Sequence, residues 1–184
     1  MISNGVKTRV KIKKPKTRVF IDGANIFYTQ KDLGWTIDWE KVIDFLNKSW
    51  EVLGIKYYTG IRAGDDKMRR YLKYLDVIGV IPVTKPLKKI KTKKGTIFKS
   101  NFDVEMTTDI LLERKGLDEI ILFTGDSDFH SLVKKLKDFG KKVVVFSSRK
   151  MIAWELKLSV SEYIFLEDLK QKIIRNKNLR PKAE

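Results

Sequence analysis

The sequence predicts an α/β fold in which a mainly parallel central sheet of about five strands is covered by helices on both faces. Short apolar runs of strand type, rich in β-branched and aromatic residues, alternate along the chain with segments of helical periodicity. Two of the strand segments, residues 18–25 and 119–130, end in a glycine-containing turn that carries aspartates. With 184 residues and 42% hydrophobic content, the chain is long enough to bury one α/β core.

The first half of the chain alternates strands and helices, and each assignment rests on a local signal. Asp38 precedes a helical repeat of apolar residues, as an N-cap residue does. Asp65 and Asp66 start another helix, where their charges complement the helix dipole. Pro82 lacks a backbone N–H, which places its strand at an edge of the sheet. The elements expected here are strands over residues 18–21, 55–62 and 79–83, and helices over residues 22–31, 38–50 and 64–78.

The second half begins with a lysine-rich segment, residues 85–99, which is predicted to form a β-hairpin or a mobile loop. A helix over residues 100–114 follows, and Val104 and Leu112 are expected on its buried face. Trp154 is expected to lie in the core. The remaining elements are strands over residues 120–124, 142–146 and 163–166, and helices over residues 129–139, 151–158 and 167–174.

Basic segments flank the predicted domain, which spans residues 18–174. Residues 1–17 contain six lysines and arginines and no acid, so we expect a basic arm that adds phosphate affinity. A solvated tail without a binding role is the alternative. Residues 175–184 are predicted to form a basic C-terminal tail that frays.

Composition narrows the class of partner. The chain carries 39 Lys and Arg against 23 Asp and Glu, a net charge of +16, which favours a polyanion such as nucleic acid. Adaptation to heat or salt is the alternative, but it would raise both signs of charge together. The absence of cysteine excludes disulfides and thiolate metal sites. No segment approaches the run of about 18 apolar residues that a membrane helix needs, so we expect a soluble, cytoplasmic protein with no membrane partner.

Aspartates are expected to gather at the carboxyl edge of the sheet. Parallel strands end at the same edge, so the strands that precede Asp22 and Asp126 would bring these residues and Asp128 together. Two like charges about 4 Å apart repel by about 4 kcal/mol at an effective dielectric constant of about 20. Such a cluster must bind protons or a cation, and hard oxygen ligands favour Mg²⁺ or Mn²⁺. The alternative is that each aspartate caps the helix that follows it, as Asp128 could.

Two further residues are candidates for the same site. Asp103 lies in the first turn of its helix, whereas Asp109 lies about 120° further round that helix. We therefore expect Asp103 to be a ligand and Asp109 to be a supporting or structural acid. Asn25 follows Asp22 by three residues and could orient a water or a phosphate, or instead satisfy the backbone of the turn. His130, the sole histidine, is expected to be a surface or packing residue and not a catalytic base.

Basic and hydroxyl residues near this edge are candidates for contacting a phosphate backbone. The lysines of residues 85–99 would form a basic rim beside the acids, although lysines also protect exposed sheet edges from aggregation. The residues expected to contact nucleic acid are Lys88, Lys89, Lys91, Lys93, Lys94, Lys99, Ser127, Ser147 and Arg149.

Four motifs together resemble the NYN (LabA-like) domains of the PIN-like nuclease superfamily. They are FIDGAN at residues 20–25, FDVEMTTDIL at 102–111, LFTGDSDFHSLVKKLKDFGKKVVVF at 122–146 and SEYIFLEDL at 161–169. The resemblance implies a PIN-like Rossmannoid fold with α/β/α layers, RNA cleavage or processing, and a divalent metal held by Asp22, Asp103, Asp126 and Asp128. One departure concerns Asp103: this chain has Asn101-Phe102 where the family often has a glycine before the helix acid.

The combined expectation is a metal-dependent ribonuclease, more specifically an endoribonuclease, that uses Mg²⁺ or Mn²⁺. Asp128 or Asn25 would position the attacking water. RNA is the expected partner, with single-stranded DNA as an alternative, and a homodimer is left open. A non-catalytic RNA-binding or scaffold protein is the first alternative function. A haloacid-dehalogenase-type phosphohydrolase is less favoured, because that chemistry needs a second acid where this chain has Ala24.

Overall fold

The computed structural model describes residues 13–92 and 95–176. Most of the predicted N-terminal arm, the tip of the lysine-rich segment and most of the C-terminal tail therefore lie outside the described residues. The strands are β1 (Lys16–Asp22), β2 (Glu51–Ile61), β3 (Val80–Pro86), β4 (Lys88–Thr92), β5 (Gly95–Lys99), β6 (Glu119–Phe123), β7 (Lys142–Ser147) and β8 (Glu162–Phe165). The helices are α1 (Gly23–Leu33), α2 (Trp39–Ser49), α3 (Asp66–Val77), α4 (Asp103–Glu113), the 3₁₀ turn η1 (Ser127–Phe129), α5 (His130–Asp138), α6 (Trp154–Ser159) and α7 (Leu166–Ile173).

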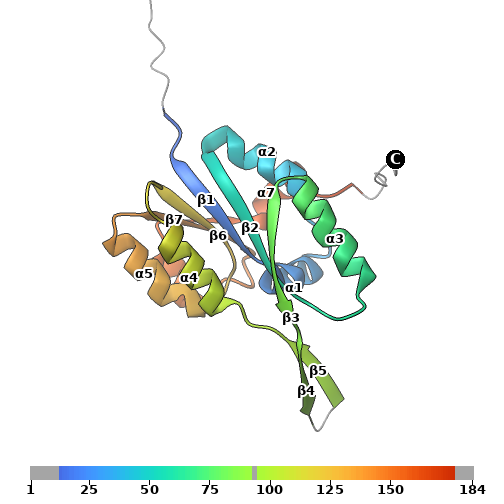
Figure 1. Ribbon diagram of the computed structural model, residues 1–184. Coiled ribbons are helices and arrows are strands. Elements are labelled where there is room, and N and C mark those ends of the chain that lie inside the picture. The colour runs from blue at the N-terminus through green and yellow to red at the C-terminus, as the bar shows by residue number, and fades with distance from the viewer. Residues whose placement is uncertain (1–12, 93–94, 177–184) are drawn as a thin grey trace, which may run out of the picture.

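A six-stranded parallel sheet in the order β3-β2-β1-β6-β7-β8 forms the middle layer (Figure 1). Helices cover both of its faces. Val19 and Ile21 of β1 pack on the face covered by α1, α2, α3 and α7, whereas Phe20 packs on the face covered by α4, α5 and α6. Burial on both faces explains why the strand segments are continuously apolar and do not alternate with polar residues. The prediction of a parallel sheet between two helical layers is confirmed.

The order of the strands reverses between β1 and β6. From β1 the chain adds β2 and β3 on one side, and after α4 it adds β6, β7 and β8 on the other. Ile21 of β1 lies opposite Phe123 of β6, so these two strands end side by side. Ligands of open parallel α/β sheets bind in the crevice beyond such a reversal. This crevice receives Asp22 from β1 and the aspartates that follow β6.

Several local predictions differ from the structure. The sheet has six strands and not about five, because all six predicted strand segments pair in it, including the short last strand β8. Val104 and Leu112 were expected to be buried but are exposed, and α4 packs on the sheet through Met106 and Ile110. Trp154 is also exposed, because the short helix α6 faces the core with Leu156. Helical spacing alone did not determine which apolar stripe would face the sheet.

The edge position of β3 and the hairpin are confirmed. β3 pairs only with β2 within the six-stranded sheet. β4 and β5 pair in antiparallel fashion, and Figure 1 shows this hairpin projecting from the body beyond the carboxyl end of β3. In the described part of the chain, no helix combines the length and the apolar character needed to cross a bilayer.

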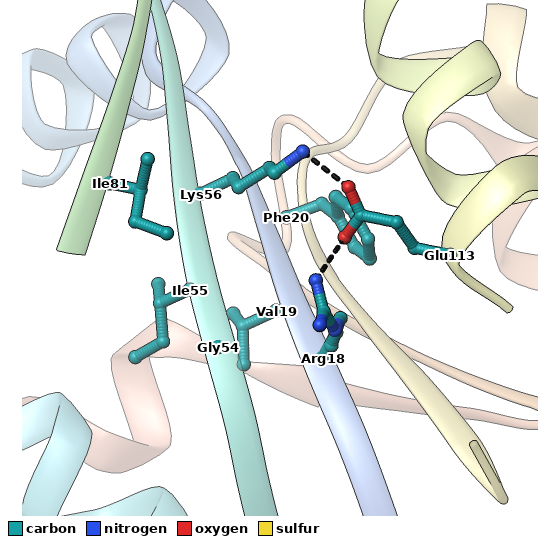
Figure 2. Close-up of a pocket in the computed structure, with 8 residues that line it drawn as sticks. All are labelled: Arg18, Val19, Phe20, Gly54, Ile55, Lys56, Ile81 and Glu113. Atoms are coloured by element: carbon teal, nitrogen blue, oxygen red, sulfur yellow. Dashed lines mark hydrogen bonds and ion pairs between the residues drawn. The ribbon is translucent and has the colours of Figure 1, made fainter. Parts of the chain in front are cut away.

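A charged network joins α4 to the sheet. Glu113 pairs with both Arg18 of β1 and Lys56 of β2 beside a small pocket between these elements (Figure 2). One turn earlier, Asp109 accepts hydrogen bonds from Lys56 Nζ at 2.8 Å and from Tyr58 Oη at 2.7 Å. Burial opposes ionisation of Asp109, but these two hydrogen bonds outweigh it and lower its pKa. Asp109 is thus a structural acid that helps to fix α4, the helix that begins with Asp103.

Candidate metal centre

Asp22 is held at the end of β1 by hydrogen bonds to its carboxylate. Its Oδ1 accepts from the backbone N–H of Asn25 at 3.0 Å, which makes it the N-cap of α1. Its Oδ2 accepts from the Thr124 hydroxyl at 3.3 Å, so β1 and β6 are linked at the point where the strand order reverses. The two bonds together restrain the carboxylate at the carboxyl edge of the sheet.

The loop after β6 is held by two local polar contacts and by one contact with the start of α1. The Asn25 side-chain oxygen accepts from Gly125 N at 3.0 Å, and the Thr124 hydroxyl accepts from Asp126 N at 3.2 Å. Asp126 in turn caps η1, since its Oδ1 accepts from Asp128 N at 3.0 Å. Asn25 therefore positions the aspartate loop, which is the backbone role that the sequence left open.

Asp103 reaches the site from the start of α4. Its backbone N–H donates to Asn101 Oδ1 at 2.8 Å. The preceding Phe102 is buried, with its ring 5.9 Å from that of Tyr58, and Lys85 Nζ lies 4.4 Å from the same ring. The Asn101-Phe102 pair thus supplies both an acceptor for the first N–H of α4 and an apolar anchor for its first turn.

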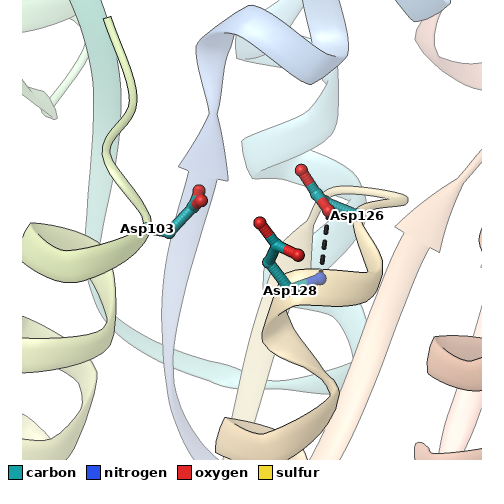
Figure 3. Close-up of side chains that lie close together, drawn as sticks. All are labelled: Asp103, Asp126 and Asp128. Carbon is teal, nitrogen blue, oxygen red and sulfur yellow. Dashed lines mark hydrogen bonds between the residues drawn. The ribbon is translucent and has the colours of Figure 1, made fainter.

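Three carboxylates from two distant segments converge at this point (Figure 3). One oxygen from each of Asp103, Asp126 and Asp128 lies within 4.8 Å of the other two. Oxygens on opposite sides of a cation with bonds of about 2.1 Å lie about 4.2 Å apart, so the cluster is near the spacing of Mg²⁺ or Mn²⁺ ligands. Asp22 is not a member of this close group. The donor set consists of hard carboxylate oxygens, which fits these cations better than zinc or copper.

Crowding of negative charge changes the acidity of the site. Burial raises the pKa of the Asp22 carboxyl, against its hydrogen bonds, and the charges of Asp103 and Asp126 raise it further. Burial also raises the pKa of Asp103; a hydrogen bond with Asn101 opposes this effect, and the charges of Asp126 and Asp128 add to the rise. The metal-free site therefore retains protons at a higher pH than isolated aspartates would, and a cation would relieve the same repulsion.

We expect Asp103→Asn to stabilise the metal-free protein in a pH-dependent way. The raised pKa means that folded wild-type protein binds more protons than the unfolded chain between about pH 3.9 and the folded pKa, so its stability falls as pH rises through that window. The variant lacks this loss, so its advantage in melting temperature should be absent near pH 3.5 and appear as pH rises toward 7. Thermal unfolding in chelator measures the difference. Added Mn²⁺ should stabilise the wild type more than the variant, and an advantage that did not change with pH would contradict the assignment.

The family follows from comparison with known sequences. A family model described as the NYN domain matches residues 16–167, which is most of the chain. The chain belongs to the NYN domain family. Because NYN domains are a PIN-like nuclease family, membership indicates a nuclease-type function related to RNA.

Two individual proteins resemble this NYN domain along most of their length. The low amplitude and bright protein LabA of Synechococcus elongatus is 32% identical over 168 residues, which cover 89% of this chain and 90% of LabA. A crystal structure of a protein of unknown function from Vibrio parahaemolyticus superposes with a TM-score of 0.74 at 23% identity, covering 88% of this chain and 97% of that one. The structural similarity supports the fold, and the relation to LabA supports the family.

The predicted nucleic-acid contacts of the NYN domain lie in different settings. Lys88 and Lys89 are exposed on β4, and Ser127 is exposed between the two aspartates of the loop. The side chains of four other lysines of the predicted rim fall outside what the structure describes; they are Lys91, Lys93, Lys94 and Lys99. The contribution of this rim to binding remains a prediction.

Ser147 and Arg149 are less available than their positions in the sequence suggested. Ser147 is 1% exposed and its hydroxyl has no hydrogen-bond partner among the described residues. Arg149 donates to both carboxylate oxygens of Asp168, at 2.7 and 2.8 Å, and its guanidinium lies 4.5 Å from the Phe165 ring centroid. A phosphate contact by Arg149 would compete with this pairing.

Thr124 is a residue of the site that no sequence motif predicted. Its hydroxyl donates to Asp22 and accepts from the backbone of Asp126, so one side chain links both acidic segments. The available signal was its position at the end of a buried strand immediately before Gly125. A hydroxyl there is fully buried and needs polar partners.

Proposed function

We propose that this NYN domain is a metal-dependent ribonuclease that hydrolyses phosphodiester bonds inside RNA chains. The observation that carries the proposal is the convergence of Asp103, Asp126 and Asp128 at the reversal of strand order. These three carboxylates would hold Mg²⁺ or Mn²⁺, with Asp22 beside them as a further ligand. When bound, such a cation supplies Lewis-acid polarisation of a phosphoryl oxygen and acidifies water.

The residues of the chain would contribute orientation and charge. Asp128 is the exposed member of the cluster and would accept a hydrogen bond from the attacking water. Asn25 would act through the loop, because its side-chain oxygen already holds Gly125. Thr124 is hydrogen-bonded to both Asp22 and Asp126 and so restrains their relative positions. Because these groups are held in place before the reaction, they would stabilise the transition state without rearranging.

The surrounding charge supports a polyanionic substrate. The net charge of +16 is opposite in sign to the acidic cluster. Basic side chains on the surface would bind the phosphate backbone, while the cation held by the carboxylates would contact the phosphate that is cleaved. Lys88 and Lys89 lie on the hairpin that leads through β5 to Asp103. This combination favours a nuclease over a hydrolase of small phosphomonoesters.

Incubation of the purified protein with a labelled circular RNA and a single-stranded circular DNA of matching sequence tests the proposal. Each would be incubated with Mn²⁺, Mg²⁺ or chelator. We expect linear products from the RNA with either metal and none with chelator, because a circle can be opened only by internal cleavage. Preferential opening of the DNA circle would reassign the substrate.

A non-catalytic RNA-binding protein is the alternative that the same experiment recognises. Tight binding of RNA without any product under all metal conditions would support that alternative, with the carboxylates as a structural cation site. Cleavage that persists in chelator would contradict the metal-dependent assignment.

A further inference from the structure

A groove lies beside the acidic site, between α5 and α6. It has a volume of about 290 Å³ and is lined by His130, Lys134, Trp154, Glu155, Leu158 and Ser159. Neither the aspartate cluster nor the lysine-rich hairpin contributes a residue to this lining. The groove is therefore a separate surface whose use the proposed chemistry leaves unexplained.

The wall that α6 contributes has two exposed apolar side chains beside Glu155 and Ser159. Trp154 is 65% exposed and Leu158, one helical turn later, is 66% exposed. Their spacing of four residues places both side chains on one face of the helix. An indole left in contact with water forgoes the stabilisation that burial would bring, and exposed apolar surface of this kind marks interaction sites.

The groove adjoins the acids through two short connections. His130 of the lining follows Asp128 by two residues. On the other wall, the N–H of Ala153, which directly precedes Trp154, donates to the Gly125 carbonyl at 2.8 Å. Gly125 in turn precedes Asp126, so the α5 wall begins two residues after Asp128 and the α6 wall is hydrogen-bonded to the residue before Asp126. A strand whose phosphate lay at the acids would have its neighbouring nucleotide at the groove.

The wall that α5 contributes is basic. His130, Lys134 and Lys137 recur at intervals of four and three residues, which places them on one face of α5. Lys134 is exposed and, within the described part of the chain, takes part in no ion pair. Lys137 Nζ donates to the carbonyl of Ser159 at 3.0 Å, so its charge lies at the α6 end of the lining.

We propose that this groove binds an unpaired nucleotide of the RNA strand, next to the phosphate that is cleaved. The base stacks on Trp154 and packs against Leu158, while Lys134 pairs with the adjoining phosphate. Base stacking on an aromatic side chain beside cationic residues is the general mode of single-strand recognition. Glu155 accepts hydrogen bonds from base amino groups, as carboxylates do. The inference rests on the proposed function, because it uses the acids to locate the strand.

Charge favours a nucleotide over a second copy of the chain. A symmetric dimer through this groove would need a self-complementary patch, because a twofold interface places the same surface on both sides. Lys134 and Lys137 outnumber the single acid of the lining, Glu155, so the patch has an excess of positive charge. A stable interface also buries about 800 Å² on each partner, whereas this lining comprises six residues. A phosphate backbone instead complements Lys134 and Lys137.

The test compares matched variants in RNA binding. Leu158→Ala lies in the groove, and Leu112→Ala is its control, because Leu112 is a similarly exposed leucine (72%) on α4. Fluorescence anisotropy with a labelled 12-nucleotide single-stranded RNA, in chelator, reports affinity without cleavage. We expect Trp154→Ala to weaken binding by about 5-fold to 100-fold and Leu158→Ala by a smaller factor. Leu112→Ala should bind as wild type does, and Trp154→Phe should recover part of the loss.

The second arm of the test uses RNAs that lack one base. An abasic site at the position bound in the groove should weaken wild-type binding, and it should add little to the loss already caused by Trp154→Ala. Non-additivity of this kind reports a direct contact. Light scattering of the same variants reports their oligomeric state.

The outcomes separate this inference from the proposed function. Weakened binding by Trp154→Ala in a protein that never cuts RNA would uphold the groove and reject the nuclease. Cleavage by wild type with unchanged RNA affinity in both groove variants would overturn the groove alone. Loss of a dimer in Trp154→Ala without a change in RNA affinity would reassign the groove to self-association. A wild-type protein that binds no RNA would overturn both.

Discussion

Asp126→Asn is expected to reduce metal-dependent RNA cleavage by about 100-fold or more, while the affinity for RNA stays nearly unchanged. The substitution removes one negative charge from the three-carboxylate cluster and so weakens the hold on the cation. The fold should survive, because the asparagine side-chain oxygen can still accept from Asp128 N and keep the cap of η1. The affinity for RNA comes from basic side chains elsewhere on the surface and does not require this carboxylate.

Initial cleavage rates and anisotropy titrations of wild type and variant measure the two quantities side by side. Asp138→Asn is the matched control, since it makes the same chemical change at an exposed residue that ends α5 and faces Lys135 at 3.8 Å. The control should cleave at the wild-type rate. Equal cleavage by Asp126→Asn and wild type would remove Asp126 from the catalytic site.

Gly125→Ala is expected to lower the free energy of unfolding by about 1–3 kcal/mol and to impair cleavage at the same time. A Cβ at this position would lie 2.2 Å from the Met151 carbonyl oxygen and 2.7 Å from the Ser147 hydroxyl. The first of these contacts is with backbone, so a rotamer change cannot relieve it. The aspartate loop must move instead, which weakens its bonds to Asn25 and Ala153 and displaces Asp126.

Gly54→Ala provides the control for this prediction. A Cβ on Gly54 meets no atom within 4 Å, and its φ is outside the left-handed region. We therefore expect the control to unfold at the wild-type denaturant concentration and to cleave normally. Chemical denaturation and cleavage rates for the two variants suffice for the comparison. If both alanine variants proved equally stable, the close approach of Gly125 to Met151 would not constrain the loop.

The sequence was most informative where a local signal is strong. Asp38 does cap α2, and its carboxylate accepts from Lys41 N at 3.3 Å. Pro82 does lie in an edge strand. The continuous apolar segments correctly predicted strands buried on both faces. In a sheet with one face in water, every second side chain of such a run would be exposed.

Predictions failed where two faces of a helix were both partly apolar. α4 carries Val104 and Leu112 on one side and Met106 and Ile110 on the other, and the second pair packs against the sheet. Asp109 and Glu113 of the same helix pair with β1 and β2, and no local pattern encodes these contacts. Trp154 is a second case, in which a contact between distant segments, the hydrogen bond from Ala153 N–H to the Gly125 carbonyl, holds the start of α6.

The sequence by itself determined the parallel α/β architecture, the acids at the carboxyl ends of β1 and β6, and the basic character of the chain. These properties follow from local periodicity and composition, which need no knowledge of distant contacts. The sequence also suggested Asp103 as a ligand, but only the tertiary structure decided how close it lies to Asp126 and Asp128. Only the tertiary structure decided that Asn25 holds the loop and that Trp154 faces a groove beside the acids. These features depend on contacts between segments tens of residues apart, and such contacts are set by how helices pack on the finished sheet.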